Sequence, residues 1–359
     1  MKRRIVTNLM LLTAAVASSI YSCKKEHNTT STGPVYNITQ TNLVADFTGA
    51  NAAKTDTNLV NAWGLAANPN GIIWVSSNHK SVSTVYDSTG STLRPPVNIP
   101  QSGSPTGIVF NSTADFSGSK FIFAGEDGVI TAWTAGNEAV PVLGAAGGVY
   151  KGLAMGSVNN INYLYAANFK GGKIDVIDKD FNYVPANSFK DPNLPAGFAP
   201  FNIQNIGGML YVTYAKLKGP DNEDDDAAPG NGYVNIFKPD GTFVRRFASQ
   251  GALNSPWGIT RAPAGFAAAT ETILVGNFGD GKINIFDVNG NYKGQLQKDG
   301  KPVSIEGLWA LDFLKTNPVA SSKLYFTAGP GDESHGVLGY LKSSFSAGTG
   351  SSGRTSGGY

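Results

Sequence analysis

Tyr163-Leu164-Tyr165-Ala166-Ala167-Asn168, followed by Gly172-Lys173-Ile174-Asp175-Val176-Ile177-Asp178, is the clearest copy of a repeat that runs through this chain. It reads as two short apolar strands joined by a polar turn that contains glycine. The same pattern of two strands and a turn recurs almost unchanged at 272–287, and more divergent copies recur roughly every 45 to 55 residues. A short-strand repeat of this length is typical of a β-propeller, because one repeat cannot bury both faces of its sheet alone.

Six copies of this pattern lie along the chain. Their first strands begin at Trp63-Gly64-Leu65, Ser104-Pro105-Thr106-Gly107, Lys151-Gly152-Leu153, Pro200-Phe201-Asn202, Trp257-Gly258-Ile259 and Leu308-Trp309-Ala310. With 44 glycines and 19 prolines in 359 residues, the chain can form the many tight turns that such a design needs. The sequence therefore predicts an all-β, six-bladed β-propeller built as a single domain.

Each copy shows three clear strands, whereas a propeller blade usually has four. We predict that the fourth strands come from weaker segments between copies, such as Tyr183-Val184-Pro185 and 243–247. The extended segment from Tyr36 to Phe47 precedes the first copy and has no copy of its own. We expect it to form the outer strand of the last blade, which would close the ring and remove an exposed sheet edge.

The two ends of the chain differ in composition from the repeats. A basic start at Lys2-Arg3-Arg4 leads into an apolar run at 9–17, which is too short to span a bilayer comfortably. We predict a signal peptide over 1–22, a flexible tether over 23–35, the propeller over 36–342 and a disordered tail rich in Gly and Ser over 343–359.

The only cysteine, Cys23, follows the predicted signal peptide within Ile20-Tyr21-Ser22-Cys23. This string resembles a bacterial lipobox, in which the thiol is acylated, although Tyr21 stands where a small residue is usual. The alternative is an ordinary signal peptide with a cysteine nearby. The lipobox implies an extracytoplasmic lipoprotein of the cell envelope, held by Cys23 in a bacterial membrane, which we expect to be the outer one.

The charge balance excludes some partners. The formal net charge of +2 includes Lys2, Arg3 and Arg4, which would leave with the signal peptide, so the mature chain would be close to neutral. A nearly neutral chain lacks the excess of basic residues that binds nucleic acid. As a separate expectation, the protein is a monomer.

Two local motifs suggest ligands that their context does not favour. Gly276-Asn277-Phe278-Gly279-Asp280-Gly281-Lys282 has the spacing of a phosphate-binding loop, but Ile283 replaces the Ser or Thr that would bind magnesium. We interpret it as a hairpin turn capped by Asn277. The acidic run 221–226 suggests calcium, but it lacks the glycine of a helix-loop-helix calcium site, so a solvated loop is the preferred interpretation.

The most promising place for a ligand is one end of the central channel. In a propeller, the beginnings of the innermost strands and the turns after the second strands emerge on the same face. The candidates there are Asn61, Trp63, Glu126, Asp127, Asn202, Asn254, Trp257, Asn277, Glu306 and Trp309. The tryptophans could instead pack between the blades as core.

The beginnings of these copies resemble a family of uncharacterised secreted bacterial propeller proteins over roughly 40–341. The strings that carry the resemblance are 61–66, 104–110, 199–206, 253–258 and 276–281. More remotely, the chain is similar to NHL-repeat propellers and to calcium-dependent lactonases. The lactonase resemblance implies one divalent cation, here calcium, at the channel mouth, with Glu306, Asp127, Asn202 and Asn254 as candidate ligands.

Two functions follow from these features. The preferred one is a lipid-anchored binding module for an extracellular glycan, peptide or protein, because amides pair with hydroxyl groups and aromatic rings stack on sugars. The alternative is a metal-dependent lactonase or esterase with its site at the central channel. A propeller fold alone does not choose between them.

Overall fold

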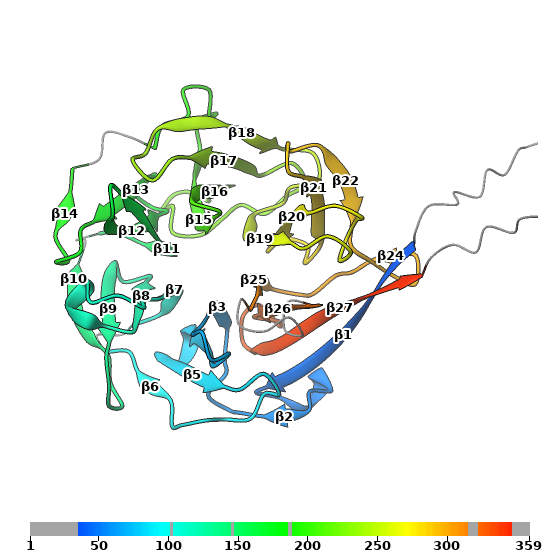
Figure 1. The fold of residues 1–359 in the computed structure, drawn as a ribbon, viewed down its shortest axis with the longest axis horizontal. Helices are drawn as coiled ribbons and strands as arrows, with labels where there is room; N and C mark the ends of the chain where they lie inside the picture. The colour runs from blue at the N-terminus through cyan, green and yellow to red at the C-terminus, as the bar shows by residue number, and fades with distance from the viewer. Residues whose placement is uncertain (1–34, 101–102, 145–146, 186–188, 315–321, 347–359) are drawn as a thin grey trace, which may run out of the picture. The chain divides into compact units, whose positions relative to one another are not determined.

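The computed structural model describes residues 35–100, 103–144, 147–185, 189–314 and 322–346. This part of the chain folds as an all-β, six-bladed β-propeller in a single domain, with the blades arranged around a central axis (Figure 1). Short 3-10 helices interrupt the strands at η1 (Thr48–Ala50), η2 (Asn78–Lys80) and η3 (Phe116–Gly118). Across the described ranges, no helix is long and apolar enough to cross a membrane.

The first five blades are four-stranded antiparallel sheets that follow the chain from the axis outward. Blade 1 holds β3 (Ala62–Ala67), β4 (Ile73–Ser77), β5 (Val82–Tyr86) and β6 (Val97–Asn98). Blade 2 holds β7 (Pro105–Phe110), β8 (Phe121–Gly125), β9 (Val129–Trp133) and β10 (Val140–Gly144). Blade 3 holds β11 (Tyr150–Val158), β12 (Ile161–Asn168), β13 (Lys173–Ile177) and β14 (Tyr183–Val184).

Blade 4 holds β15 (Phe198–Ile206), β16 (Met209–Lys216), β17 (Tyr233–Phe237) and β18 (Phe243–Ser249). Blade 5 holds β19 (Pro256–Ala262), β20 (Thr272–Asn277), β21 (Ile283–Asp287) and β22 (Tyr292–Gln295), and a small hairpin of β23 (Gln297–Lys298) and β24 (Lys301–Pro302) follows it. The weak segments predicted to supply fourth strands do so, as β14 and β18.

Blade 6 joins the two ends of the domain. It holds β25 (Leu308–Phe313), β26 (Lys323–Ala328) and β27 (Val337–Ser346), and then β1 (Val35–Ala45) and β2 (Lys54–Thr55) from the start of the domain. β1 runs antiparallel to β27, so the predicted closure of the ring is confirmed. The prediction that the tail begins at 343 is wrong, because β27 continues to Ser346; residues 347–359 lie outside the described chain.

The innermost strands approach one another so closely that side chains are excluded at several positions. A Cβ atom added at Gly64 would lie 2.1 Å from the Thr106 carbonyl oxygen, and one at Gly107 would lie 2.3 Å from the Leu153 nitrogen. Gly258 is equally confined against Trp309. The glycines that recur in the repeat are therefore required by the close packing of strands around the axis.

The repeated turn between second and third strands is a hairpin. Asn277 donates a hydrogen bond to the Ala252 carbonyl oxygen (2.8 Å) and to Asp280 Oδ1 (3.0 Å), and Gly281 adopts a φ of 68°. The corresponding Gly172 in blade 3 has a φ of 64°. This geometry confirms the interpretation of 276–282 as a capped turn.

Candidate functional site

Each of the six innermost strands carries an irregularity near its beginning, at the same place in every blade. The register of the strand pair shifts there, as between Ala62 and Leu65 in blade 1 or between Pro256 and Ile259 in blade 5. The residues at these bulges, one from each blade, are Trp63, Thr106, Lys151, Phe201, Trp257 and Trp309. We call the end of the channel where the inner strands begin the N-terminal mouth, and the opposite end the C-terminal mouth.

Aromatic rings close the channel below the N-terminal mouth. The rings of Trp63 and Trp309 stack with centroids 3.7 Å apart, and Trp257 meets Trp309 edge-on at 5.9 Å. The indole of Trp257 also reaches from blade 5 to the Lys151 carbonyl oxygen of blade 3, at 3.0 Å. Below these rings the channel narrows to a cavity of about 20 Å³. The three tryptophans are 1%, 1% and 4% exposed for Trp63, Trp309 and Trp257, so they form a central plug.

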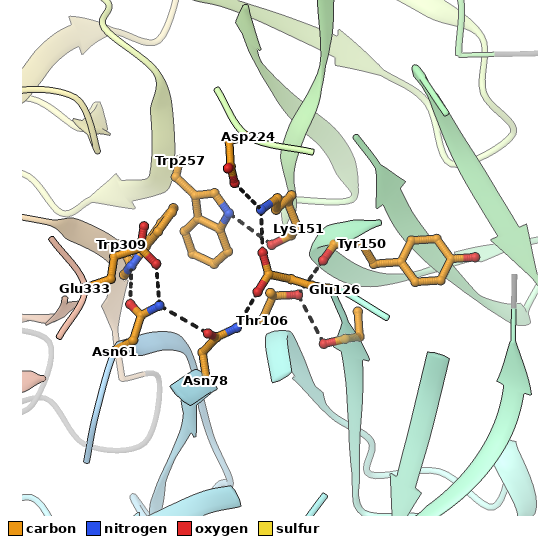
Figure 2. Close-up of polar contacts among 11 residues, drawn as sticks. Asn61, Asn78, Thr106, Glu126, Tyr150, Lys151, Asp224, Trp257, Trp309 and Glu333 are labelled. Atoms are coloured by element: carbon orange, nitrogen blue, oxygen red, sulfur yellow. Dashed lines mark hydrogen bonds and ion pairs between the residues drawn. The ribbon is translucent and has the colours of Figure 1, made fainter. Parts of the chain in front are cut away.

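Above the plug, a chain of hydrogen bonds connects three blades (Figure 2). Glu333 of blade 6 accepts a hydrogen bond from Asn61 Nδ2 at 2.5 Å, and Asn61 donates also to Asn78 Oδ1 at 3.2 Å. Asn78 then donates to Glu126 Oε2 of blade 2 at 2.9 Å. The Trp309 indole donates to Asn61 Oδ1 at 2.9 Å, which ties this polar chain to the plug beneath it.

Lys151 ends the polar chain. Its ammonium lies 2.5 Å from Glu126 Oε1 and 3.6 Å from Asp224 Oδ1, and it sits over the Trp63 ring at 5.1 Å. The side chain is only 3% exposed. Burial alone would lower the pKa of Lys151, but the negative charges of Glu126 and Asp224 outweigh it and raise that pKa. Lys151 therefore stays charged and holds Glu126 in place.

Glu333 is a titratable group of the polar chain whose surroundings shift its pKa toward neutral pH. Burial, with the negative charge of Glu126 nearby, raises the pKa of Glu333 from 4.5 to about 7. The Lys151 charge and the Asn61 hydrogen bond act in the opposite direction and are smaller. Glu333 can therefore exchange a proton near neutral pH, and a raised pKa at a polar site is typical of functional residues.

The acidic run lies in the β16–β17 loop beside this site. Its carboxylates pair with lysines: Glu223 with Lys170 at 2.7 Å and Asp226 with Lys216 at 2.7 Å, in addition to the contact of Asp224 with Lys151. The loop thus lies against the N-terminal mouth. The part of the chain described by the structure contains no group of three or more His, Cys, Asp or Glu side chains that could hold a metal ion.

Several predicted site residues are occupied elsewhere. Asn202 donates to the Trp257 carbonyl oxygen at 2.8 Å, and Asn277 caps its own turn. Glu306 accepts from the Gly331 backbone at 3.0 Å, and Asp127 Oδ1 accepts from the Val129 backbone at 3.1 Å. Asn254 is 6% exposed, and its Oδ1 has no partner. The calcium site expected at Glu306, Asp127, Asn202 and Asn254 stays a prediction.

The structure brings together Asn61, Trp63, Glu126, Trp257 and Trp309 from the predicted set. It adds Asn78, Lys151, Asp224 and Glu333, which the sequence did not single out as ligand-binding residues. Asn78 and Glu333 lie in turns after second strands, at the same level of the repeat as Glu126. Alignment of the six turns could therefore have found both. Asp224 lies in a loop without a counterpart in the other copies.

Two curated proteins are related to this chain over most of its length. Uncharacterized protein R648 of Acanthamoeba polyphaga mimivirus is 35% identical over 314 residues, which cover 81% of this chain and 76% of that protein. Uncharacterized protein L690 of the same virus is 34% identical over 315 residues, covering 81% and 82%. The chain belongs to their family. No protein-family model matches the chain. Since these family members are viral, the expected bacterial origin stays a prediction.

Solved structures share the fold at low sequence identity. A protein of unknown function from Bacteroides thetaiotaomicron has a TM-score of 0.55 at 10% identity, covering 86% of this chain and 76% of that chain. A streptogramin B lyase has a TM-score of 0.54 at 12% identity, covering 86% and 98%. The calcium-binding protein regucalcin from Agrobacterium tumefaciens has a TM-score of 0.51 at 14% identity, covering 79% and 90%. These likenesses show the propeller fold, in agreement with the remote resemblance found in the sequence.

Proposed function

We propose that this family member is a binding module that takes an uncharged, hydroxyl-rich ligand, such as a glycan, at the N-terminal mouth. One observation carries the proposal: the hydrogen-bonded chain from Glu333 through Asn61 and Asn78, which gathers side chains of three blades above the plug. Amide and carboxylate oxygens accept hydrogen bonds from sugar hydroxyls, and amide nitrogens donate to them.

The exposed parts of the site suit such a ligand. The carboxylates of Glu126 and Asp224 are 28% and 74% exposed, so each has room to accept a hydroxyl proton. Phe278 is partly exposed, and its ring stacks on Trp309 with a centroid distance of 4.0 Å. Trp309 holds the Phe278 ring in place, so the other face of the Phe278 ring can stack on a sugar. Lys151 offsets one of the negative charges, and this favours a neutral ligand over a cation.

A glycan array probed with the purified protein tests the proposal. We expect a subset of neutral glycans to be retained, and Asp224→Asn to weaken that binding by about tenfold, since one hydrogen bond to a charged group is worth about 1.5–3 kcal/mol. Glu333→Gln should also weaken it, because the variant removes a carboxyl group of the polar chain. Asp180→Asn, in an exposed turn of blade 3, is the matched control. Retention of no glycan, or equal binding by all variants, would contradict the proposal.

A hydrolase is the second candidate, and the pKa of Glu333 near 7 favours it. A carboxyl group that gains and loses its proton near neutral pH suits general acid–base catalysis. Hydrolysis of aryl esters and lactones, measured with and without calcium, tests this candidate. Activity that disappears in Glu333→Gln but survives in Asp180→Asn would favour the enzyme over the binding module.

We propose further that Cys23 carries a lipid that anchors the protein to a membrane on the extracytoplasmic side. The support is the lipobox-like string at 20–23, which lies outside the described residues. In a bacterial host, labelled palmitate should be incorporated into the wild-type chain and not into Cys23→Ser. Labelling of both proteins, or of neither, would remove the anchor from the account.

A further inference from the structure

A second cavity lies between blades 1 and 2, away from the polar chain. It has a volume of about 540 Å³, and its lining includes residues 68–70 and Ile72, the rings of Trp74, Phe110, Phe121 and Trp133, and the cations Arg94 and Lys120. Residues 68–72 follow the end of the inner strand β3, so the cavity opens on the side of the C-terminal mouth. The site proposed above lies at the other end of the inner strands.

Aromatic rings form the wall of this cavity. Trp74 and Phe121 stack with centroids 4.1 Å apart, and Trp133 leans on Trp74 at 4.6 Å. Trp74 and Phe121 are each 3% exposed, whereas Trp133 and Phe110 are partly exposed. The buried rings hold the partly exposed ones in fixed orientations, which leaves a rigid apolar surface suited to a flat ligand.

Arg94 is positioned over this surface by the neighbouring blade. It belongs to the β5–β6 connection of blade 1, but its guanidinium bonds to the Gly136 carbonyl oxygen and to Asn137 Oδ1 (3.1 Å) of blade 2. Its Cζ atom lies 4.9 Å from the Trp133 ring centroid and 5.8 Å from that of Trp74. Because these hydrogen bonds go to neutral groups, the positive charge of Arg94 is not neutralised by them.

Lys120 adds a second positive charge at the rim. It is exposed, and within the described ranges its ammonium forms no ion pair. The described residues that line the cavity include two cations and neither Asp nor Glu. An apolar pocket with unbalanced positive charge at its edge is complementary to an aromatic or similarly flat anion.

We propose that the cavity between blades 1 and 2 is a binding site for a planar apolar anion, such as an aromatic carboxylate or sulfonate. The flat body lies against Trp133 and Phe110, and the anionic group meets Arg94 and Lys120. The pocket is independent of the glycan site at the N-terminal mouth.

A pair of probes of nearly equal shape tests the proposal by calorimetry. Naphthalene-2-sulfonate carries a negative charge, and naphthalene-2-sulfonamide is neutral. We expect the anion to bind the wild-type protein about tenfold more tightly, because only the anion can pair its charge with Arg94 and Lys120. Arg94→Gln should reduce this preference to about threefold or less, and Lys120→Gln should reduce it in part.

The controls separate charge from damage to the fold. Lys301→Gln removes an exposed lysine from β24 and should leave both affinities unchanged. Trp133→Ala should weaken both probes, while the melting temperature reports whether the variant is folded. Equal affinity of the wild-type protein for both probes, or a preference for the anion that survives in Arg94→Gln and Lys120→Gln, would overturn the proposal.

Discussion

Individual side chains at the N-terminal mouth form hydrogen bonds that stabilise the fold and also belong to the proposed binding site. Asn61 uses both ends of its amide, donating to Glu333 and Asn78 while accepting from the Trp309 indole. The sequence predicted Asn61 from its place before an inner strand. It did not single out Glu333, although this residue lies in the turn after the second strand of blade 6, which ring closure brings beside blade 1.

The raised pKa of Glu333 predicts a pH dependence of stability. The folded chain holds the Glu333 proton up to about pH 7, whereas the unfolded chain releases it near pH 4.5. Between these values the folded state binds more protons, so wild-type stability should fall as the pH rises. Glu333→Gln removes this titration, and relative to wild type it should gain up to about 3 kcal/mol between pH 4 and 8. Urea unfolding of both proteins at pH 4 and pH 8 measures the difference in their unfolding free energies. The same difference at both pH values would contradict the raised pKa of Glu333.

The ion pair between Lys151 and Glu126 should also contribute to the free energy of unfolding. Lys151→Met removes the partner of Glu126 and should cost about 2–3 kcal/mol of unfolding free energy, less than for a fully buried pair because Glu126 is 28% exposed. Glu126→Gln combined with Lys151→Met should recover part of that loss, since no carboxylate then lacks its partner. Additive losses in the double variant would show that the pair is not coupled.

At the scale of elements, the strands could be predicted from the sequence and the bulges of the inner strands could not. Short apolar strands and glycine turns have local causes, so the sequence predicted strands at 183–185 and 243–247, and the structure has them at 183–184 and 243–249. The bulges that aim Trp257 and Lys151 into the channel depend on pairing with the next strand. The same pairing explains why rings that could have faced a ligand form a buried plug.

The glycines of the inner strands should not tolerate a side chain, because the neighbouring strand packs directly against them. Gly107→Ala places a Cβ atom 2.3 Å from the Leu153 nitrogen, so we expect a loss of about 1–3 kcal/mol in unfolding free energy. Gly144→Ala, in the outer strand of the same blade, meets nothing within 4 Å and should change stability little. Chemical denaturation of both variants compares them; equal midpoints would mean that the inner strands can move apart.

For the whole molecule, closure by β1 is the decisive contact. β1 contributes the buried side chains Ile38, Leu43 and Val44 and covers the edge of β27. The sequence predicted this closure because 36–47 had no copy in the repeat, and an unpaired strand needs a partner. The ligand was beyond the sequence, since the polar site combines turns from distant blades with a loop that has no counterpart in the repeat.

Removal of β1 should open the ring. A chain that begins at residue 46 loses the buried side chains of Ile38, Leu43 and Val44, worth about 1.5–3 kcal/mol each, and that of Ala45, so we expect loss of cooperative unfolding. A peptide of residues 34–47 added in trans should restore it by pairing with β27. The control is a chain that begins at residue 34. Full stability without β1, or no effect of the peptide, would show that closure matters less than the pairing suggests.

Binding of a ligand at the N-terminal mouth should change the NMR signals of the indole N–H groups, of which the chain has five, one in each tryptophan. The Trp309 indole bonds to Asn61 and that of Trp257 to the Lys151 carbonyl oxygen, whereas the indole of Trp133, which lines the cavity between blades 1 and 2, bonds to the Gly136 carbonyl oxygen. In an NMR titration with the glycan that the array retains, we predict shifts of the Trp309 and Trp257 signals and none of Trp133. A shift of Trp133 alone, or no shift with any glycan, would contradict the account.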